Sequence, residues 1–238
     1  MVSDTPSIPL RPESEIQGPN QARFNALGQH LVSKLKGDEV LISTFHGENS
    51  DFVRFNGGDV RQAGSVTQGQ IGLCLIDGQR QAQAGATISG DDVADRARLE
   101  RMLVDLRERL PHLPEDPYLN YATEIQSTES RVREEIPDAG EAVARIHEET
   151  RGRDLVGIYA SGDIYRGLLN SLGQENWYAT RNFNFDWSFY HSGDKAVKSA
   201  YAGLEWDAEA FARKIDLATR QLTALEKTSK TIQPGRYR

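Results

Sequence analysis

The order of strand-like and helix-like segments occurs twice along this chain, and this repetition is the strongest constraint on its fold. In the first half, strand-like segments between residues 39 and 88 precede a helical pattern at about 91–110. In the second half, strand-like segments between 155 and 204 precede a helix that Asp207 caps. Two copies of a hairpin-hairpin-helix unit predict an α/β (α+β) fold, in which helices pack on a mixed or antiparallel sheet.

Short glycine-containing turns separate the predicted strands. In the first unit, residues 56–59 (NGGD) supply the positive φ angles of a tight hairpin, and residues 77–78 (DG) turn the chain back again. In the second unit, we assign turns to residues 161–163 and 192–194, which both read SGD. The stretches VRFNGGDVRQ and IYASGDIYRG are therefore expected to occupy equivalent places in the two units.

Apolar residues at three- and four-residue steps predict helices at about 20–36, 91–110 and 138–151, and after Asp207. A residue pattern that resembles a capping box begins the second of these helices at Ser89. The expected buried stripes are Phe24, Leu27, Leu31 and Leu35 in the first helix, Leu99, Met102, Leu103, Leu106 and Leu110 in the second, and Phe211, Ile215, Ala218, Leu222 and Leu225 in the last.

Two strands are assigned to the core. The run IGLCLI is apolar on both faces, which predicts a central strand covered on both sides, with Cys74 as a small buried residue. The run RNFNFDWSFY alternates strictly, and its aromatic face is expected to be buried. That face consists of Phe183, Phe185, Trp187 and Phe189.

The 238 residues, of which 38% are hydrophobic, allow one large core or two modest ones. We expect a flexible N-terminal tail at 1–19 and one α/β domain at 20–238. The halves of this domain, about 20–110 and 138–228, are joined by a proline-rich connector.

Charge and cysteine content exclude several classes of function. The net charge is −7, from 28 basic and 35 acidic residues that are interspersed, which argues against a nucleic-acid partner. Cys74 is the only cysteine, so the chain has no internal disulfide and a reducing compartment is expected. The N-terminal residues include prolines and acids where a signal peptide would be apolar, and no run is long enough to span a membrane. We therefore predict a cytoplasmic protein without a membrane partner.

The sequence has no recognisable catalytic or metal-binding motif. The histidines, His30, His46, His112, His147 and His191, include no pair at the spacing that places two ligands on one helix face. Ser161 lies in a predicted turn and not in a G-x-S-x-G motif. We therefore assign no catalytic residue and no metal ligand to this chain.

Two groups of polar residues are candidate binding residues. Asn170, Gln174, Asn176 and Trp177 lie between two predicted strands, where amides can hydrogen-bond an extended backbone; the alternative is a polar loop.

The second group is Arg54, Arg61 and Gln62, around the NGGD turn. They form either the polar face of a hairpin or the lining of a binding surface or subunit contact.

Several long stretches together resemble the N-terminal domain of the TldD/PmbA family of metalloprotease-related proteins, particularly its TldE-like branch. They are FVRFNGGDVRQAG, LPEDPYL, DLVGIYASGDIYRG with LLNSLGQENW, FNFDWSFY and DKAVKSAYAGLEW. The resemblance implies a mixed α/β domain that acts in proteolysis or peptide maturation. It also implies a homodimer, or a heterodimer with a TldD-like relative, around a chamber that takes in peptide or unfolded protein.

The catalytic apparatus of the family has no counterpart in these residues. Active members hold zinc through a His-Glu-x-x-x-His helix and a later cysteine in a C-terminal domain, which we expect to be absent from this chain. The resemblance therefore implies a substrate-enclosing and assembly domain. The alternative is a non-catalytic TldE-like partner subunit that completes the chamber of a zinc-bearing relative.

Overall fold

The computed structural model describes residues 21–132, 136–191, 195–228 and 230–237. The predicted tail at 1–19 and the predicted turn at 192–194 lie outside these residues. The helices are α1 (Gln21–Val32), α2 (Asp92–Arg109), α3 (Ala139–Thr150) and α4 (Ala208–Ala224), and a short 3-10 turn, η2 (Leu110–His112), follows α2. The strands are β1 (Val40–Asn56), β2 (Asp59–Asp77), β3 (Arg80–Thr87), β4 (Thr128–Val132), β5 (Asp154–Asn170), β6 (Glu175–Tyr190) and β7 (Ala196–Gly203).

All seven strands form one sheet in the order β3-β2-β1-β5-β6-β4, and β7 pairs with the other end of β6. Neighbouring strands are antiparallel except β4 and β6, which are parallel. An order of elements does repeat, because β1-β2-β3-α2 is followed by β5-β6-β7-α4, but each unit has three strands before its helix and not the two predicted hairpins. The predicted fold class, helices packed on a mixed sheet, is confirmed.

The first two strands are longer than the sequence pattern suggested. The segments EVLISTFHG and FVRFN form one strand, β1, of 17 residues, which pairs along its length with the 19 residues of β2. The NGGD turn between them is confirmed: Gly57 and Gly58 have φ angles of 63° and 83°, as a two-residue hairpin loop requires. The turn at Gly78, with φ 58°, is also confirmed.

The prediction of a turn at residues 161–163 is wrong. These residues lie inside β5, which runs unbroken from Asp154 to Asn170. Gly162 is needed there because β1 passes very close: a Cβ on Gly162 would lie 2.2 Å from the carbonyl oxygen of Asn49. The turn that corresponds to NGGD is at residues 171–174, and the second unit has three strands where we expected four.

All four helices cover the same face of the sheet. Along β1 the buried apolar residues are odd-numbered, from Leu41 and Phe45 at one end to Val53 and Phe55 at the other. Because side chains alternate along a strand, these residues share one face. Leu155, Tyr159 and Leu169 of β5 and Phe183, Phe185, Trp187 and Phe189 of β6 follow the same rule.

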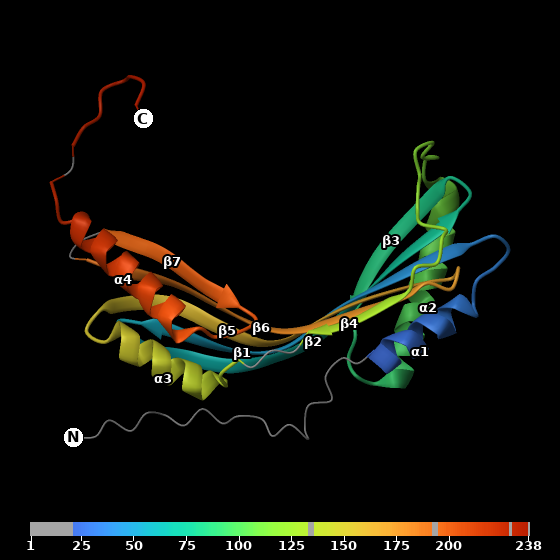
Figure 1. Ribbon diagram of the computed structural model, residues 1–238. Helices are drawn as coiled ribbons and strands as arrows, with labels where there is room; N and C mark the ends of the chain where they lie inside the picture. Colours follow the sequence, from blue (N-terminus) through green and yellow to red (C-terminus); the bar gives the residue numbers. More distant parts are fainter. Residues whose placement is uncertain (1–20, 133–135, 192–194, 229, 238) are drawn as a thin grey trace.

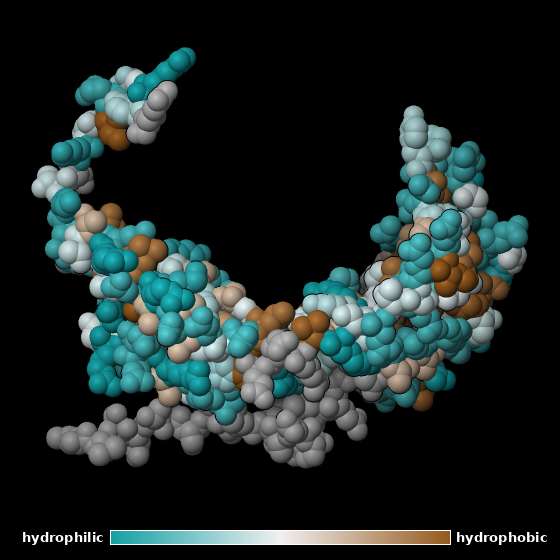
Figure 2. All heavy atoms as spheres, viewed as in Figure 1, coloured by the Kyte–Doolittle hydropathy of each residue, from teal (hydrophilic) through white to brown (hydrophobic). Residues whose placement is uncertain are grey.

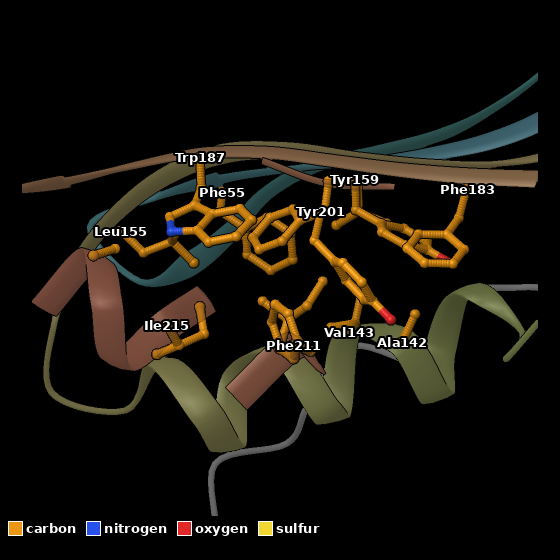
Figure 3. Close-up of a cluster of buried hydrophobic side chains, with 14 of the residues drawn as sticks. Phe55, Ala142, Val143, Leu155, Tyr159, Phe183, Trp187, Tyr201, Phe211 and Ile215 are labelled. Carbon is orange, nitrogen blue, oxygen red and sulfur yellow. The ribbon is translucent and has the colours of Figure 1, made fainter. Parts of the chain in front are cut away.

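The buried residues on this face form two separate clusters. The α1–α2 core includes Phe24, Leu31, Phe45, Leu73, Leu103 and Trp177. The α3–α4 core includes Phe55, Val143, Tyr159, Trp187, Tyr201, Phe211 and Ile215, and Figure 3 shows these side chains between the sheet and the two helices. The aromatic face of RNFNFDWSFY lies in the second core, as predicted.

Of the two helix caps predicted from the sequence, one is at the predicted residue and the other is at a different residue. Asp207 caps α4 by accepting a hydrogen bond from the Ala210 amide, as predicted. The cap of α2 is Asp91, two residues after Ser89, where the predicted capping box begins, and the helix starts at Asp92, close to the predicted start at about residue 91. Ser89 instead donates its backbone amide and its hydroxyl to the buried carboxylate of Asp95.

The connector between the halves contains a strand that the sequence pattern did not indicate. β4 has only one apolar residue, Val132, and pairs with β6 at the sheet edge. The sheet bends between its two ends, and the helices lie on the outer side of the bend (Figure 1). The opposite face of the sheet therefore lines the inner side.

Candidate functional site

The face of the sheet opposite the helices is the candidate site, and we call it the helix-free face. It carries the even-numbered residues of β1, β5 and β6, those of β2 from Gln62 to Ile76, and the odd-numbered residues of β3. Its side chains are rich in amides and hydroxyls, and Figure 2 shows a hollow between the two ends of the molecule. Exposed or half-buried members are Thr44, Ser50, Gln62, Gln68, Gln70, Gln81, Gln83, Asn182, Asn184 and Ser188.

Three cavities lie along this face. One, of about 310 Å³, is near the middle of the strands, one of about 550 Å³ is near the β1–β2 hairpin, and one of about 450 Å³ is near β3. Their positions follow the course of β1, from Ile42 in the third cavity through His46 in the first to Arg54 in the second. A single extended ligand along β1 would therefore pass all three.

The middle cavity is lined by polar side chains. His46, Glu48, Gln68, Gln70 and Arg166 surround it. The Glu48 carboxylate accepts hydrogen bonds from the Gln68 amide and from the Ser50 hydroxyl, at 3.1 Å for the latter. The cavity thus offers both donors and acceptors in fixed positions.

The cavity near β3 is more apolar and contains the cysteine. Ile42, Ile76 and Cys74 line it from the sheet, and Leu119 and Tyr121 line it from the connector. Cys74 is half-buried and points to the helix-free face, so its predicted place in the core is wrong. Burial raises the pKa of the Cys74 thiol, which donates to Gln81 Oε1 at 3.6 Å.

The structure brings Arg54, Arg61 and Gln62 together near the hairpin. Gln62 is directly opposite Arg54 in the register of β1 and β2, and both arginines line the 550 Å³ cavity. All three side chains are exposed. The guanidinium of Arg54 lies 5.9 Å from the centre of the Phe52 ring.

The amides of the second predicted group also lie together, at the β5–β6 turn. Asn170 is buried, and its Oδ1 accepts hydrogen bonds from the backbone amides of Leu172 and Gln174, both at 3.0 Å. Gln174 donates to Asn176 Oδ1 at 2.7 Å. Asn176 in turn donates to the Gln126 carbonyl at 2.9 Å, so these amides attach the connector to the turn.

Side chains alternate along β6, so the side chain of Trp177 lies on the opposite face of the sheet from that of Asn176. Its side chain is 3% exposed and lies in the α1–α2 core, where its ring stacks on Phe45 at 5.6 Å. Any effect of Trp177 on binding would therefore act through the packing of the strand that carries it.

Sequence patterns missed most of the helix-free face. Gln68, Gln70, Gln81 and Gln83 occupy alternate positions of β2 and β3, which is the period-2 signal of one strand face.

In the described residues, no three His, Cys, Asp or Glu side chains gather in a way that could hold a metal ion. No helix described here has the length and apolar character needed to cross a membrane.

Solved structures with the same arrangement identify the fold. TldE from Thermococcus kodakarensis superposes with a TM-score of 0.55 at 12% identity, over 84% of this chain and 47% of that one. The fold is TldE-like. The resemblance found in the sequence is thus confirmed at the level of the fold.

Two further solved structures support this assignment. A protein from Thermotoga maritima, described as a proposed modulator of a DNA gyrase, gives a TM-score of 0.60 at 13% identity over 90% of this chain. A protein of the same description from Bacteroides thetaiotaomicron gives 0.56 at 14% identity over 86%. The chain spans about half the length of these solved structures, at 47%, 50% and 49%. Scans by sequence match no protein-family profile and no curated protein.

Proposed function

We propose that this chain is a substrate-enclosing and assembly domain of a TldD/PmbA-type, metallopeptidase-related protein, which binds extended polypeptide along its helix-free face in the cytoplasm. The observation that carries the proposal is the inner face of the bend, which is lined by amides and hydroxyls and hollowed at three places. Side-chain amides offer a donor and an acceptor to any peptide group, so such a face suits substrates of varied sequence.

The TldE-like fold supports the proposed class of protein. In the active members that the chain resembles, zinc chemistry belongs to a different domain. The role proposed for these residues is therefore to bind and guide polypeptide and to contact a partner subunit.

A variant that fills the middle cavity tests the binding role. Gln70 is exposed on the helix-free face, and Ala63 is exposed on the opposite face of the same strand. We expect Gln70→Trp to weaken binding of a labelled, unstructured peptide at least about fivefold, because the indole occupies the cavity. Ala63→Trp, the matched control, should bind as the unsubstituted chain does, as measured by fluorescence anisotropy. Equal binding by all three proteins would contradict the proposal.

A second candidate is the non-catalytic partner subunit, which the similarity to TldE favours. This role requires a stable complex with a TldD-like relative. Size-exclusion chromatography with light scattering on a mixture of the two proteins should then give the mass of a heterodimer. Separate elution of the two proteins would exclude this candidate and leave self-association for the assembly role.

A further inference from the structure

The cavity near the β1–β2 hairpin differs from the rest of the helix-free face in its charge. Arg54 from β1, Arg61 from β2 and Lys198 from β7 all line it. In the described part of the chain, none of these three side chains has a carboxylate within ion-pair distance. Three unpaired cations around one cavity stand out in a chain whose net charge is −7.

A bulge in β2 places the second arginine in this cavity. Arg54 is opposite Gln62 and Phe55 is opposite Val60, so Arg61 is an extra residue with no opposite partner in the register. Without the bulge, the alternation of β2 would direct Arg61 to the helix-covered face. Bulges commonly redirect a side chain in this way near functional sites.

The cavity has an apolar floor between two cationic sides. Arg54 is opposite Ile158 in β5, and Lys198 is opposite Ser188 in β6, so three strand spacings, or about 14 Å, separate their strands. The apolar Val156 and Ile158 of β5 lie between them, next to Ser188 and Asp186 of β6. The one acidic side chain in the lining, Asp186, accepts a hydrogen bond from Asn184 at 3.0 Å.

We propose that this cavity binds the carboxylate of an acidic side chain near one end of the bound polypeptide, and so sets the direction of the polypeptide along β1. The inference rests on the proposed polypeptide-binding function. A guanidinium offers two parallel N–H donors that match the two oxygens of a carboxylate. The contact between the Arg54 guanidinium and the Phe52 ring limits the motion of the Arg54 side chain. The apolar floor accommodates the methylene groups that carry the carboxylate.

The charge of the whole face selects a peptide over a nucleic acid. Beyond this cavity, the middle cavity is lined by one carboxylate, Glu48, and one guanidinium, Arg166, and the cavity near β3 is lined by no charged side chain. A nucleic acid needs cations along its whole backbone, whereas a peptide with one or two carboxylates needs them at one place.

Two 12-residue labelled peptides that differ only in Glu or Gln at one end provide the test. The site variant is R54Q/R61Q/K198Q, and the matched control is R96Q/R101Q/K214Q, which removes three exposed, unpaired cations from the helices on the other face. Fluorescence anisotropy with the full chain should show the Glu peptide bound about tenfold more tightly than the Gln peptide. The site variant should remove this difference, and the control variant should retain it.

The outcomes separate this inference from the proposed function. Equal binding of the Glu and Gln peptides to the unsubstituted chain would overturn the carboxylate site but leave the peptide-binding face intact. Failure of both peptides to bind would overturn both. If the site variant and the control variant lost the preference for the Glu peptide equally, the preference would come from the net charge of the chain and not from this cavity. Displacement of the Glu peptide by a short single-stranded oligonucleotide at equal concentration would overturn the choice of a peptide.

Discussion

Gly162 is the residue at which the close pairing of β1 and β5 leaves no room for a side chain. A Cβ there would lie 2.2 Å from the Asn49 carbonyl oxygen and 2.5 Å from the Ser50 Cα, and both are backbone atoms that cannot turn away. We expect Gly162→Ala to lower the free energy of unfolding by about 2 to 4 kcal/mol, since the strands must separate. Urea unfolding measures this change. In the control, Gly85→Ala, the nearest atom is a side-chain nitrogen at 3.4 Å, so a loss as large as that of Gly162→Ala would contradict the explanation.

Asp95 links the start of α2 to α1 through a buried carboxylate. Burial alone would raise its pKa, but hydrogen bonds from Ser89 and Gly90 and the charge of Arg23, whose Nη2 lies 2.9 Å away, outweigh burial and lower the pKa. A lowered pKa stabilises the fold above the unfolded value of about 3.9, and this contribution is lost as the pH falls through the folded value.

Replacement of Asp95 tests this linkage. We expect Asp95→Asn to cost about 1 to 3 kcal/mol at neutral pH, because hydrogen bonds to a charged acceptor are lost or weakened. The same variant should lose less stability than the unsubstituted chain between neutral pH and about pH 3. Thermal unfolding across this pH range measures both effects. Asp105→Asn, at an exposed position of the same helix, is the control; an acid response in Asp95→Asn as steep as in that control would refute the assignment.

At the scale of elements, the β5–β6 turn holds the connector and β4 in place. Asn176 donates to the Gln126 carbonyl at 2.9 Å and to the Thr128 hydroxyl at 2.8 Å. We expect Asn176→Ala to cost about 1 to 2 kcal/mol and to speed amide exchange in β4, because two hydrogen bonds to the connector are lost. Hydrogen exchange by mass spectrometry gives the location. Asn184→Ala, with a single bond to Asp186, is the control and should leave exchange in β4 unchanged.

The elements also indicate which signals the sequence carries. Two consecutive glycines between segments of alternating apolar and polar residues predicted the NGGD hairpin correctly, because this combination is typical of a two-residue hairpin loop and of few other structures. The single glycine in SGD did not distinguish a turn from a close approach of two paired strands. Both require a residue without a side chain, and only the position of the neighbouring strand separates the two cases. β4 was missed because a five-residue edge strand with one apolar residue has little hydrophobic pattern.

The candidate site was predictable only in part for a related reason. Arg54, Arg61 and Gln62 were identified because they lie close together in sequence around one turn. Lys198 was not identified, because its place beside them depends on the pairing of β1 with β5, β5 with β6 and β6 with β7. The register between strands that are distant in sequence depends on the packing of the whole sheet, so a local sequence pattern does not predict it.

At the scale of the whole molecule, two separate cores share the same strands. β1, β2, β5 and β6 have 16 to 19 residues each, and β1, β5 and β6 contribute side chains to both cores. The sequence repeat corresponds to elements that cannot fold apart, because β1 of the first unit pairs with β5 of the second along 14 residues of each strand, from Ile42 to Phe55 in β1. We therefore expect one cooperative unfolding transition.

A cavity in one core tests whether the strands transmit its effect to the other. Leu103 is 1% exposed in the α1–α2 core, and Leu103→Ala should lower the free energy of unfolding by about 2 to 5 kcal/mol. If the molecule unfolds as one unit, the slowest-exchanging amides around Tyr159 and Phe185 in the α3–α4 core should lose protection by the same free energy, as measured by hydrogen exchange. Val93→Ala, on the same helix at 80% exposure, should change neither core. Loss of protection confined to α1, α2 and the strands beneath them would mean that the two ends of the sheet unfold independently, and would contradict a single cooperative transition.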